Sequence, residues 1–272
     1  MNLLLAVLVA LVPPILLVGS IYIWYFFVGE VAFDNTHPTQ KIRRIVGGWI
    51  SVFISLIYTR FLKIPFTEMG ISLSPLYVPI LSIAKSLVFI LTLYLGPIYH
   101  SHISKRHLFD EAAYSSTTRS SPIFLSTIIL SPLLEEIVYR GIFLGILHTL
   151  TGKTFSSLTV GTVFSDILFS TLAFSTSHIH HIFEKDGNMK RILPQLFVTA
   201  IFGFVSTLLF DFTHSIAGPF VAHAFCNLVG APPLHLISEE PPLVQKRLWA
   251  VYVFGLVSAV FEMVLLGWFR SV

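Results

Sequence analysis

The sequence predicts an all-α polytopic membrane protein, with about eight transmembrane helices that enclose an intramembrane cavity. Of its 272 residues, 54% are hydrophobic and only 11% are charged, whereas a soluble domain has about 25% charged residues. The mean hydropathy is high, at +0.81. The apolar residues also form continuous runs, not the alternating pattern of a transmembrane β-barrel.

Eight apolar segments have about the 20 residues that a spanning helix needs. The first lacks the basic start and the cleavage site of a signal peptide, so we expect it to be retained as a helix. The seventh contains His223, Asn227 and the pair Pro232–Pro233, which favour a broken or partial span. No linker separates two domains, which predicts one transmembrane domain over residues 1–272. In order, the segments are 2–28, 44–62, 76–99, 121–149, 157–178, 192–212, 216–237 and 248–269.

Lysine and arginine are distributed unevenly between the loops, and loops rich in these residues face the cytoplasm. The even-numbered loops and the C-terminal tail hold only four of the 17 basic residues. We therefore expect the odd-numbered loops to face the cytoplasm and both termini to lie on the opposite side. The odd loops hold eleven, namely Lys41, Arg43, Arg44, Lys105, Arg106, Arg119, Lys185, Lys190, Arg191, Lys246 and Arg247.

Charge and cysteine content limit the kinds of partner and cross-link. The net charge of +3 is small and is spread between the loops, so we expect membrane lipids as partners and no nucleic acid. The single cysteine, Cys226, excludes an internal disulfide and leaves the redox compartment open.

The first of three polar sets inside the apolar segments is "SPLLEEIVYR", residues 131–140. An ionisable residue costs about 2.5–3.5 kcal/mol to insert and by default indicates function. Glu136 and Arg140 are four apart, in the favourable order for an ion pair, while Glu135 points about 100° away. The Ser131–Pro132 pair is typical of a helix N-cap, which predicts that the segment breaks and restarts there. The alternative is a purely structural ion pair, with Glu135 facing water.

The second set is "FSTSHIHH", residues 174–181, where His178 and His181 share one helix face. Histidines at a helix end are typically solvated at the interface, which is the alternative for His181. His178 lies deeper in the segment and is the better candidate for a site residue.

The third set is "HAFCN", residues 223–227, where His223 and Asn227 are four apart on one face and both can donate hydrogen bonds. Their alternative role is a hydrogen bond between helices, typically worth about 0.6 kcal/mol. Cys226 is a candidate nucleophile beside His223, but a buried cysteine is more often a small apolar filler.

The three sets are all predicted to lie in the cytoplasmic half of the membrane, so they can form one site. There Glu135 can act as general base toward water and pass the proton to a leaving amine. His178 can orient the same water. His223 and Asn227 can donate to an oxyanion, a contribution of about 2.7–4 kcal/mol per donor. These parts indicate water-driven hydrolysis of an amide.

Three other interpretations of the same residues stay open at this point. Glutamate and histidine also bind zinc, although the sequence has no H-E-x-x-H motif and no cysteine pair. A proton-coupled transporter could use Glu135, His178 and His223 as a relay, but it predicts inverted repeats, whereas the polar sets lie in the second half of the chain. A non-catalytic scaffold would use the polar sets only to pack helices.

The order E-E-x-x-x-R, F-x-x-x-H, H-x-x-x-N on successive late segments resembles the intramembrane glutamate proteases. Within the CAAX protease and bacteriocin-processing superfamily, the chain is most similar to the type II CAAX prenyl endopeptidases. The resemblance covers about residues 121–233, including "HSIAGPFVAHAFCNLVGAPP". It implies an endopeptidase of the endoplasmic reticulum membrane that removes the last three residues of prenylated CAAX proteins. A membrane protease acting on non-prenylated peptides is the alternative within the superfamily.

The resemblance also implies a role for each motif residue. Glu135 and His178 would activate water, and His223 and Asn227 would form the oxyanion hole. The reaction would need no metal and no other cofactor. The supporting residues would be Glu136 and Arg140, which hold the site in register, and His181, which continues the histidine-rich stretch.

Overall fold

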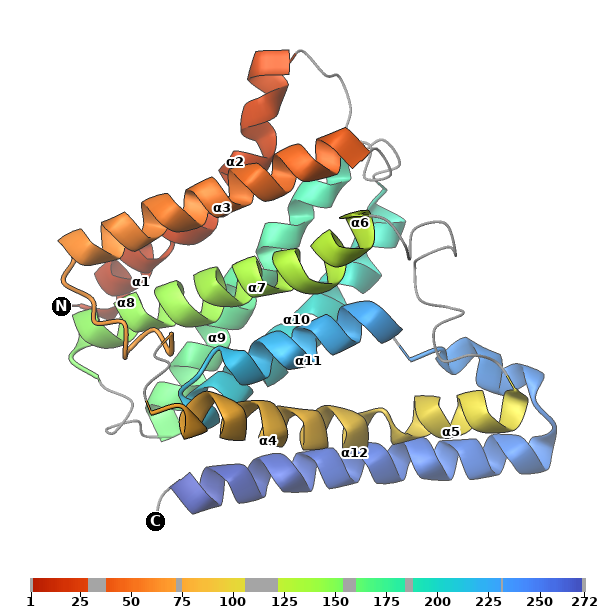
Figure 1. Cartoon of the computed structure of the whole chain (residues 1–272). Coiled ribbons are helices and arrows are strands. Elements are labelled where there is room, and N and C mark those ends of the chain that lie inside the picture. The colour runs from red at the N-terminus through yellow and green to blue at the C-terminus, as the bar shows by residue number, and fades with distance from the viewer. Residues whose placement is uncertain are drawn as a thin grey trace.

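The part of the chain that the structure describes consists of helices joined by turns and irregular segments, and it contains no strand (Figure 1). This computed structural model describes residues 2–28, 38–71, 75–105, 122–153, 160–183, 188–230 and 232–270. The α-helices are α1 (Leu3–Ala10), α2 (Val12–Val28), α3 (Pro38–Phe61), α4 (Tyr77–Leu93), α5 (Leu95–Ser104), α6 (Pro122–Leu125), α7 (Ser131–Glu136), α8 (Phe143–Thr151), α9 (Val160–Ser177), α10 (Met189–Thr213), α11 (Ala217–Val229) and α12 (Pro242–Arg270). Two π-helical turns, η1 (Ser126–Leu130) and η2 (Ile137–Ile142), and two 3₁₀ helices, η4 (His178–Phe183) and η5 (Leu234–Glu239), complete them.

The chain is a multi-pass membrane protein, but the predicted number of eight spans is not confirmed. Four described helical stretches are long and apolar enough to cross a membrane, and the bent pair α4–α5, with an angle of 53°, makes a fifth if it is one span. The seventh predicted segment forms the 13-residue helix α11, about 20 Å long and too short for a bilayer core of about 30 Å. The four stretches are Leu3–Trp24, Thr39–Phe61, Ile192–Thr213 and Pro242–Leu265.

The predicted orientation depends partly on residues that the structure does not describe. Arg106, Arg119 and Lys185 lie outside the described ranges. The orientation therefore stays a prediction.

The segment from α6 to α8 is one helical run rather than two helices separated by a cap. Ser131 has helical backbone angles (φ −68°, ψ −49°), so the predicted N-cap at Ser131 is wrong. Its N–H bonds the carbonyl of Ser126, five residues back, and the N–H of Phe143 likewise bonds that of Val138. The missing N–H of Pro132 is accommodated because a π-helical turn precedes it. Two π turns thus flank the glutamates of α7.

This helical run lies at the centre of the molecule (Figure 1). Helix α7 contacts α3 and α11, and η2 contacts α2, α3, α9 and α10. Gly141 and Gly145 allow the segment around Met69 to approach closely, because a Cβ at Gly145 would lie 2.8 Å from Met69 Cγ. The side chains of the run that are at most 1% exposed are Glu136, Val138, Tyr139, Arg140, Ile142, Phe143, Leu144, Ile146, Leu147 and His148.

The outer helices present apolar side chains to the exterior. Phe53 on α3, Phe197 on α10 and Phe254 on α12 are all more than 60% exposed. Helix α12 packs along both α4 and α5 on the side shown at the bottom of Figure 1. An exterior of this kind fits contact with lipid, while the polar residues of the motifs lie inside.

Candidate active site

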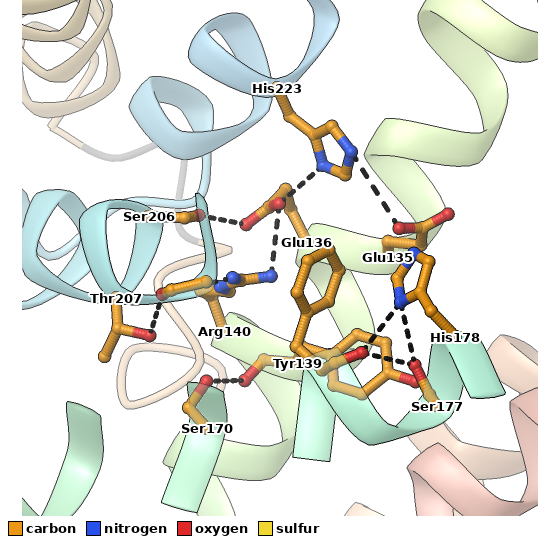
Figure 2. Close-up of polar contacts among 12 residues, drawn as sticks. Glu135, Glu136, Tyr139, Arg140, Ser170, Ser177, His178, Ser206, Thr207 and His223 are labelled. Carbon is orange, nitrogen blue, oxygen red and sulfur yellow. Dashed lines mark hydrogen bonds and ion pairs between the residues drawn. The ribbon is translucent and has the colours of Figure 1, made fainter. Parts of the chain in front are cut away.

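The two adjacent glutamates of α7 lie in different environments (Figure 2). Glu136 is fully buried, whereas the side chain of Glu135 is 25% exposed. Successive residues of a helix point about 100° apart, which separates the two carboxylates. The predicted ion pair between Glu136 and Arg140 is confirmed, with 3.3 Å between Glu136 Oε1 and Arg140 Nη1.

Glu136 is bound by three side chains from three elements. Besides Arg140 of η2, His223 of α11 places Nδ1 2.8 Å from Glu136 Oε1. Ser206 of α10 donates to Glu136 Oε2 over 2.8 Å. A buried carboxylate needs such partners to offset the loss of water. Glu136 therefore joins η2, α10 and α11.

Arg140 is held in an aromatic and polar environment. Its guanidinium carbon lies 4.4 Å from the ring centre of Phe174 and 5.8 Å from that of Phe202. Its Nη2 donates to the carbonyl oxygen of Gly203 over 3.3 Å. Cation–π contacts of a desolvated arginine are worth about 2 kcal/mol, so α9 and α10 both fix this side chain.

His223 lies between the two carboxylates. An ionised carboxylate only accepts hydrogen bonds, so Nδ1 carries the hydrogen that Glu136 receives. The other ring nitrogen, Nε2, is 3.9 Å from Glu135 Oε2. The ring packs on Phe202 and Phe174, with centroid distances of 4.5 and 5.9 Å. The carboxylate of Glu136 thus orients His223 so that its second nitrogen faces Glu135.

His178 follows α9 directly, as the first residue of η4, and is drawn with its hydrogen bonds in Figure 2. Its Nδ1 lies 2.8 Å from the carbonyl oxygen of Phe174, to which it donates. The other nitrogen, Nε2, is then the acceptor in the neutral ring. The rings of His178 and His223 both contact the ring of Phe174, with centroid distances of 4.8 and 5.9 Å. The second motif therefore lies next to His223, whose Nε2 faces Glu135.

Comparison with known proteins shows what this part of the chain is similar to. Residues 117–229 match the family model described as "Type II CAAX prenyl endopeptidase Rce1-like". The "Probable CAAX prenyl protease 2" of Schizosaccharomyces pombe is 27% identical over 210 residues, covering 74% of this chain and 72% of the relative. The "CAAX prenyl protease 2" of Caenorhabditis elegans is 28% identical over 245 residues, covering 84% and 86%.

The human "CAAX prenyl protease 2" is 30% identical over 135 residues, which cover 47% of this chain and 37% of the relative. No solved structure matches the chain. Residues 117–229, named the Rce1-like domain of this chain, are similar to the type II CAAX prenyl endopeptidases. The chain is therefore a peptidase, a class of hydrolase.

The Rce1-like domain contains all the residues that the sequence motifs single out. The last of these, Asn227, lies one turn after His223 on α11 and donates from Nδ2 to the carbonyl oxygen of Thr127 over 3.1 Å. It is thus fixed to η1, the π turn that precedes the glutamates. One of its two amide hydrogens is used in this bond.

Two further sequence candidates have neighbours that suit secondary roles. His181 and His178 both lie in the 3₁₀ helix η4, which begins at His178, and the centres of their rings are 5.8 Å apart. Cys226 receives a hydrogen bond from the hydroxyl of Tyr94, with 3.7 Å between oxygen and sulfur, and packs against an apolar cluster with Ile90. These contacts agree with Cys226 as a small apolar filler.

Several contacts of the Rce1-like domain could not be predicted from the motifs. Ser206 and Gly203 lie in an apolar stretch of α10 and carry no motif, yet they bind Glu136 and Arg140. His180 lies between the predicted histidines, and its ring is 3.3 Å from Arg44 Nη2 of α3. Serine and glycine are common in membrane helices, so only the three-dimensional arrangement reveals their function as partners.

Proposed function

We propose that the chain hydrolyses the peptide bond after the prenylated cysteine of CAAX proteins and releases the C-terminal tripeptide. The observation that supports this most directly is the partly exposed carboxylate of Glu135 in the Rce1-like domain, with His223 Nε2 at 3.9 Å. His178 and His223 both contact the ring of Phe174. The curated relatives are named CAAX prenyl proteases.

The reaction begins with water between Glu135 and His178. Glu135 accepts a proton from the water, and Nε2 of His178 accepts a hydrogen bond from it and holds it in place. The water oxygen attacks the carbonyl carbon of the prenylated cysteine, and the carbonyl oxygen becomes an oxyanion. Glu135 then gives its proton to the leaving amine as the C–N bond breaks. The products are a new carboxylate on the prenylated cysteine and the free tripeptide.

His223 and Asn227 are the proposed donors to the oxyanion. Because Glu136 accepts from Nδ1, His223 can donate through Nε2 only when both of its ring nitrogens carry hydrogen. Asn227 needs no change of protonation to donate. One of its amide hydrogens binds the carbonyl oxygen of Thr127, and the other can be donated to the oxyanion. Glu136 and Arg140 are positioning residues that hold His223 in this place.

The proposed location is the endoplasmic reticulum membrane, with the site facing the cytoplasm. The excess of lysine and arginine in the odd-numbered loops supports this orientation. A prenyl chain partitions into lipid while the tripeptide needs water, and a site inside a membrane protein can receive both. Glycosylation sites introduced into individual loops test the orientation, since only lumenal loops become glycosylated.

Purified protein offered a farnesylated CAAX peptide tests the proposed function. We expect release of the tripeptide, measured by mass spectrometry, at a rate that falls sharply when the farnesyl group is omitted. Equal cleavage of the peptide without the farnesyl group would replace the proposal with a general membrane protease. No cleavage of either peptide, with proton uptake by proteoliposomes instead, would favour the proton-coupled transporter.

A further inference from the structure

A second buried polar cluster lies outside the proposed active site. His148 of α8, Asp166 of α9 and Asp211 of α10 are each 0% exposed. One potential ligand atom from each residue lies within 4.8 Å of the other two. His148 Nε2 and Asp166 Oδ2 are 2.8 Å apart. Three helices therefore bring one imidazole and two carboxylates to a single point.

The charges of this cluster call for a cation. Two carboxylates that lie close together in the interior repel each other when ionised, and a cation between them removes this repulsion. The second oxygen of Asp166, Oδ1, is buried and has no hydrogen-bond partner among the described residues. An ionised carboxylate without a partner is costly to bury. A divalent cation would neutralise both carboxylates and leave His148 as a neutral ligand.

The ligand types favour a transition metal of borderline character. Carboxylate oxygens suit Mg²⁺, Ca²⁺ and Mn²⁺, whereas imidazole suits Zn²⁺ and its neighbours in the first transition row. The mixed set is therefore best matched by Zn²⁺ or Mn²⁺. Two ligand atoms at about 2.1 Å from one ion are at most about 4.2 Å apart. Small side-chain rotations bring atoms that lie within 4.8 Å to this distance.

We propose that His148, Asp166 and Asp211 bind one divalent transition-metal ion, Zn²⁺ or Mn²⁺, that ties α8, α9 and α10 together. The site is structural and separate from hydrolysis, because His148 follows Arg140 by eight residues, about 12 Å along the helical run. Two of the three helices also lead to the active site: α9 ends at Ser177, directly before His178, and α10 contains Ser206. The ion fixes the spacing of the helices on which those residues lie.

Metal content and thermal unfolding of the purified full-length chain test the site without any measurement of peptidase activity. With a purification tag that contains no histidine, we expect about one equivalent of Zn²⁺ or Mn²⁺ by elemental analysis. Removal of the ion with a chelator should lower Tm by about 5–10 °C, and an ion concentration near 100 times Kd should restore it. Mg²⁺ should not restore it, because imidazole is a poor ligand for that ion.

Matched variants locate the ion. Asp166→Asn and, separately, Asp211→Asn keep the side-chain shape, and both should lose the ion and the response of Tm to the chelator. Glu135→Gln should keep both properties, as should His100→Gln, which alters a buried histidine outside the cluster. Substitution with Co²⁺ gives an independent signal, since ligand-field absorption bands should appear in the wild type and vanish in Asp166→Asn.

The possible outcomes separate the metal site from the proposed hydrolysis. A wild-type chain that holds no ion and whose Tm does not respond to added Zn²⁺ or Mn²⁺ would overturn the metal site. Loss of the ion in Glu135→Gln but not in the aspartate variants would move the ion to the peptidase site and also overturn it. If the aspartate variants do not fold, the wild-type chelation and Co²⁺ measurements decide. A failure to cleave CAAX peptides leaves every one of these readouts intact.

Discussion

Removal of the Glu136 carboxylate should destabilise the protein more than any other single change in the active site. In Glu136→Gln, the guanidinium of Arg140, which is 0% exposed, loses its ionic partner inside the membrane domain. Breaking a buried ion pair by removing one partner costs about 3–5 kcal/mol. At about 2–4 °C per kcal/mol for a chain of this size class, Tm should fall by roughly 6–20 °C.

A double variant separates the uncompensated cation from other effects of the substitution. Arg140→Met in the Glu136→Gln background removes the unpaired charge, so the double variant should be more stable than Glu136→Gln alone. Thermal unfolding in detergent, followed by tryptophan fluorescence, gives both values. Glu262→Gln is the control, because Glu262 is a half-buried acid that accepts one bond from Thr92 over 2.9 Å. Its loss should cost about 1 kcal/mol.

Two results would refute this reasoning. The first is an unchanged Tm for Glu136→Gln, which would mean that the carboxylate does not compensate Arg140. The second concerns the single variant Arg140→Met, measured in the same way. If the double variant loses as much stability as Glu136→Gln and Arg140→Met together, the two residues act independently.

Three other variants test individual contacts. Ser206→Ala removes the donor to a buried carboxylate and should cost about 1.5–3 kcal/mol of unfolding free energy, measured by Tm. Asn227→Ala should lower kcat/KM by about 10²–10³ through the loss of an oxyanion donor, while its bond to Thr127 accounts for only about 0.6 kcal/mol of stability. An Asn227→Ala enzyme with wild-type kcat/KM would remove Asn227 from the oxyanion hole. Cys226→Ala should keep its activity in the same assay. A loss of activity in this variant would indicate that the thiol of Cys226 is a nucleophile.

The sequence could predict the helical class and the ion pair between Glu136 and Arg140 because both depend on local rules. Long apolar runs determine the class, and spacing by four residues puts Glu136 and Arg140 on one face. The spans could not be counted in the same way. The 53° bend between α4 and α5 was not predicted. The short helix α11 agrees with the predicted broken or partial seventh segment, and π turns around Pro132 take the place of the predicted cap.

Contacts between isolated residues on distant segments leave no pattern in the sequence. Ser206 is one serine in an apolar helix, and nothing local marks it as the partner of Glu136. The cluster of His148, Asp166 and Asp211 is a stronger case, because the three residues lie in three different helices and form no motif with their sequence neighbours. Only the packing of α8, α9 and α10 brings the three side chains together.

The role of Glu135 as the base that activates water can be measured directly with Glu135→Gln, which keeps the shape of the side chain and removes its ability to take a proton. The measurement is the rate of tripeptide release from a farnesylated CAAX peptide, with Tm recorded on the same samples. The predicted result is a fall of about 10²–10⁴ in rate, the usual contribution of a general base, at a Tm within a few degrees of wild type. Release at the wild-type rate by a folded Glu135→Gln protein would contradict it.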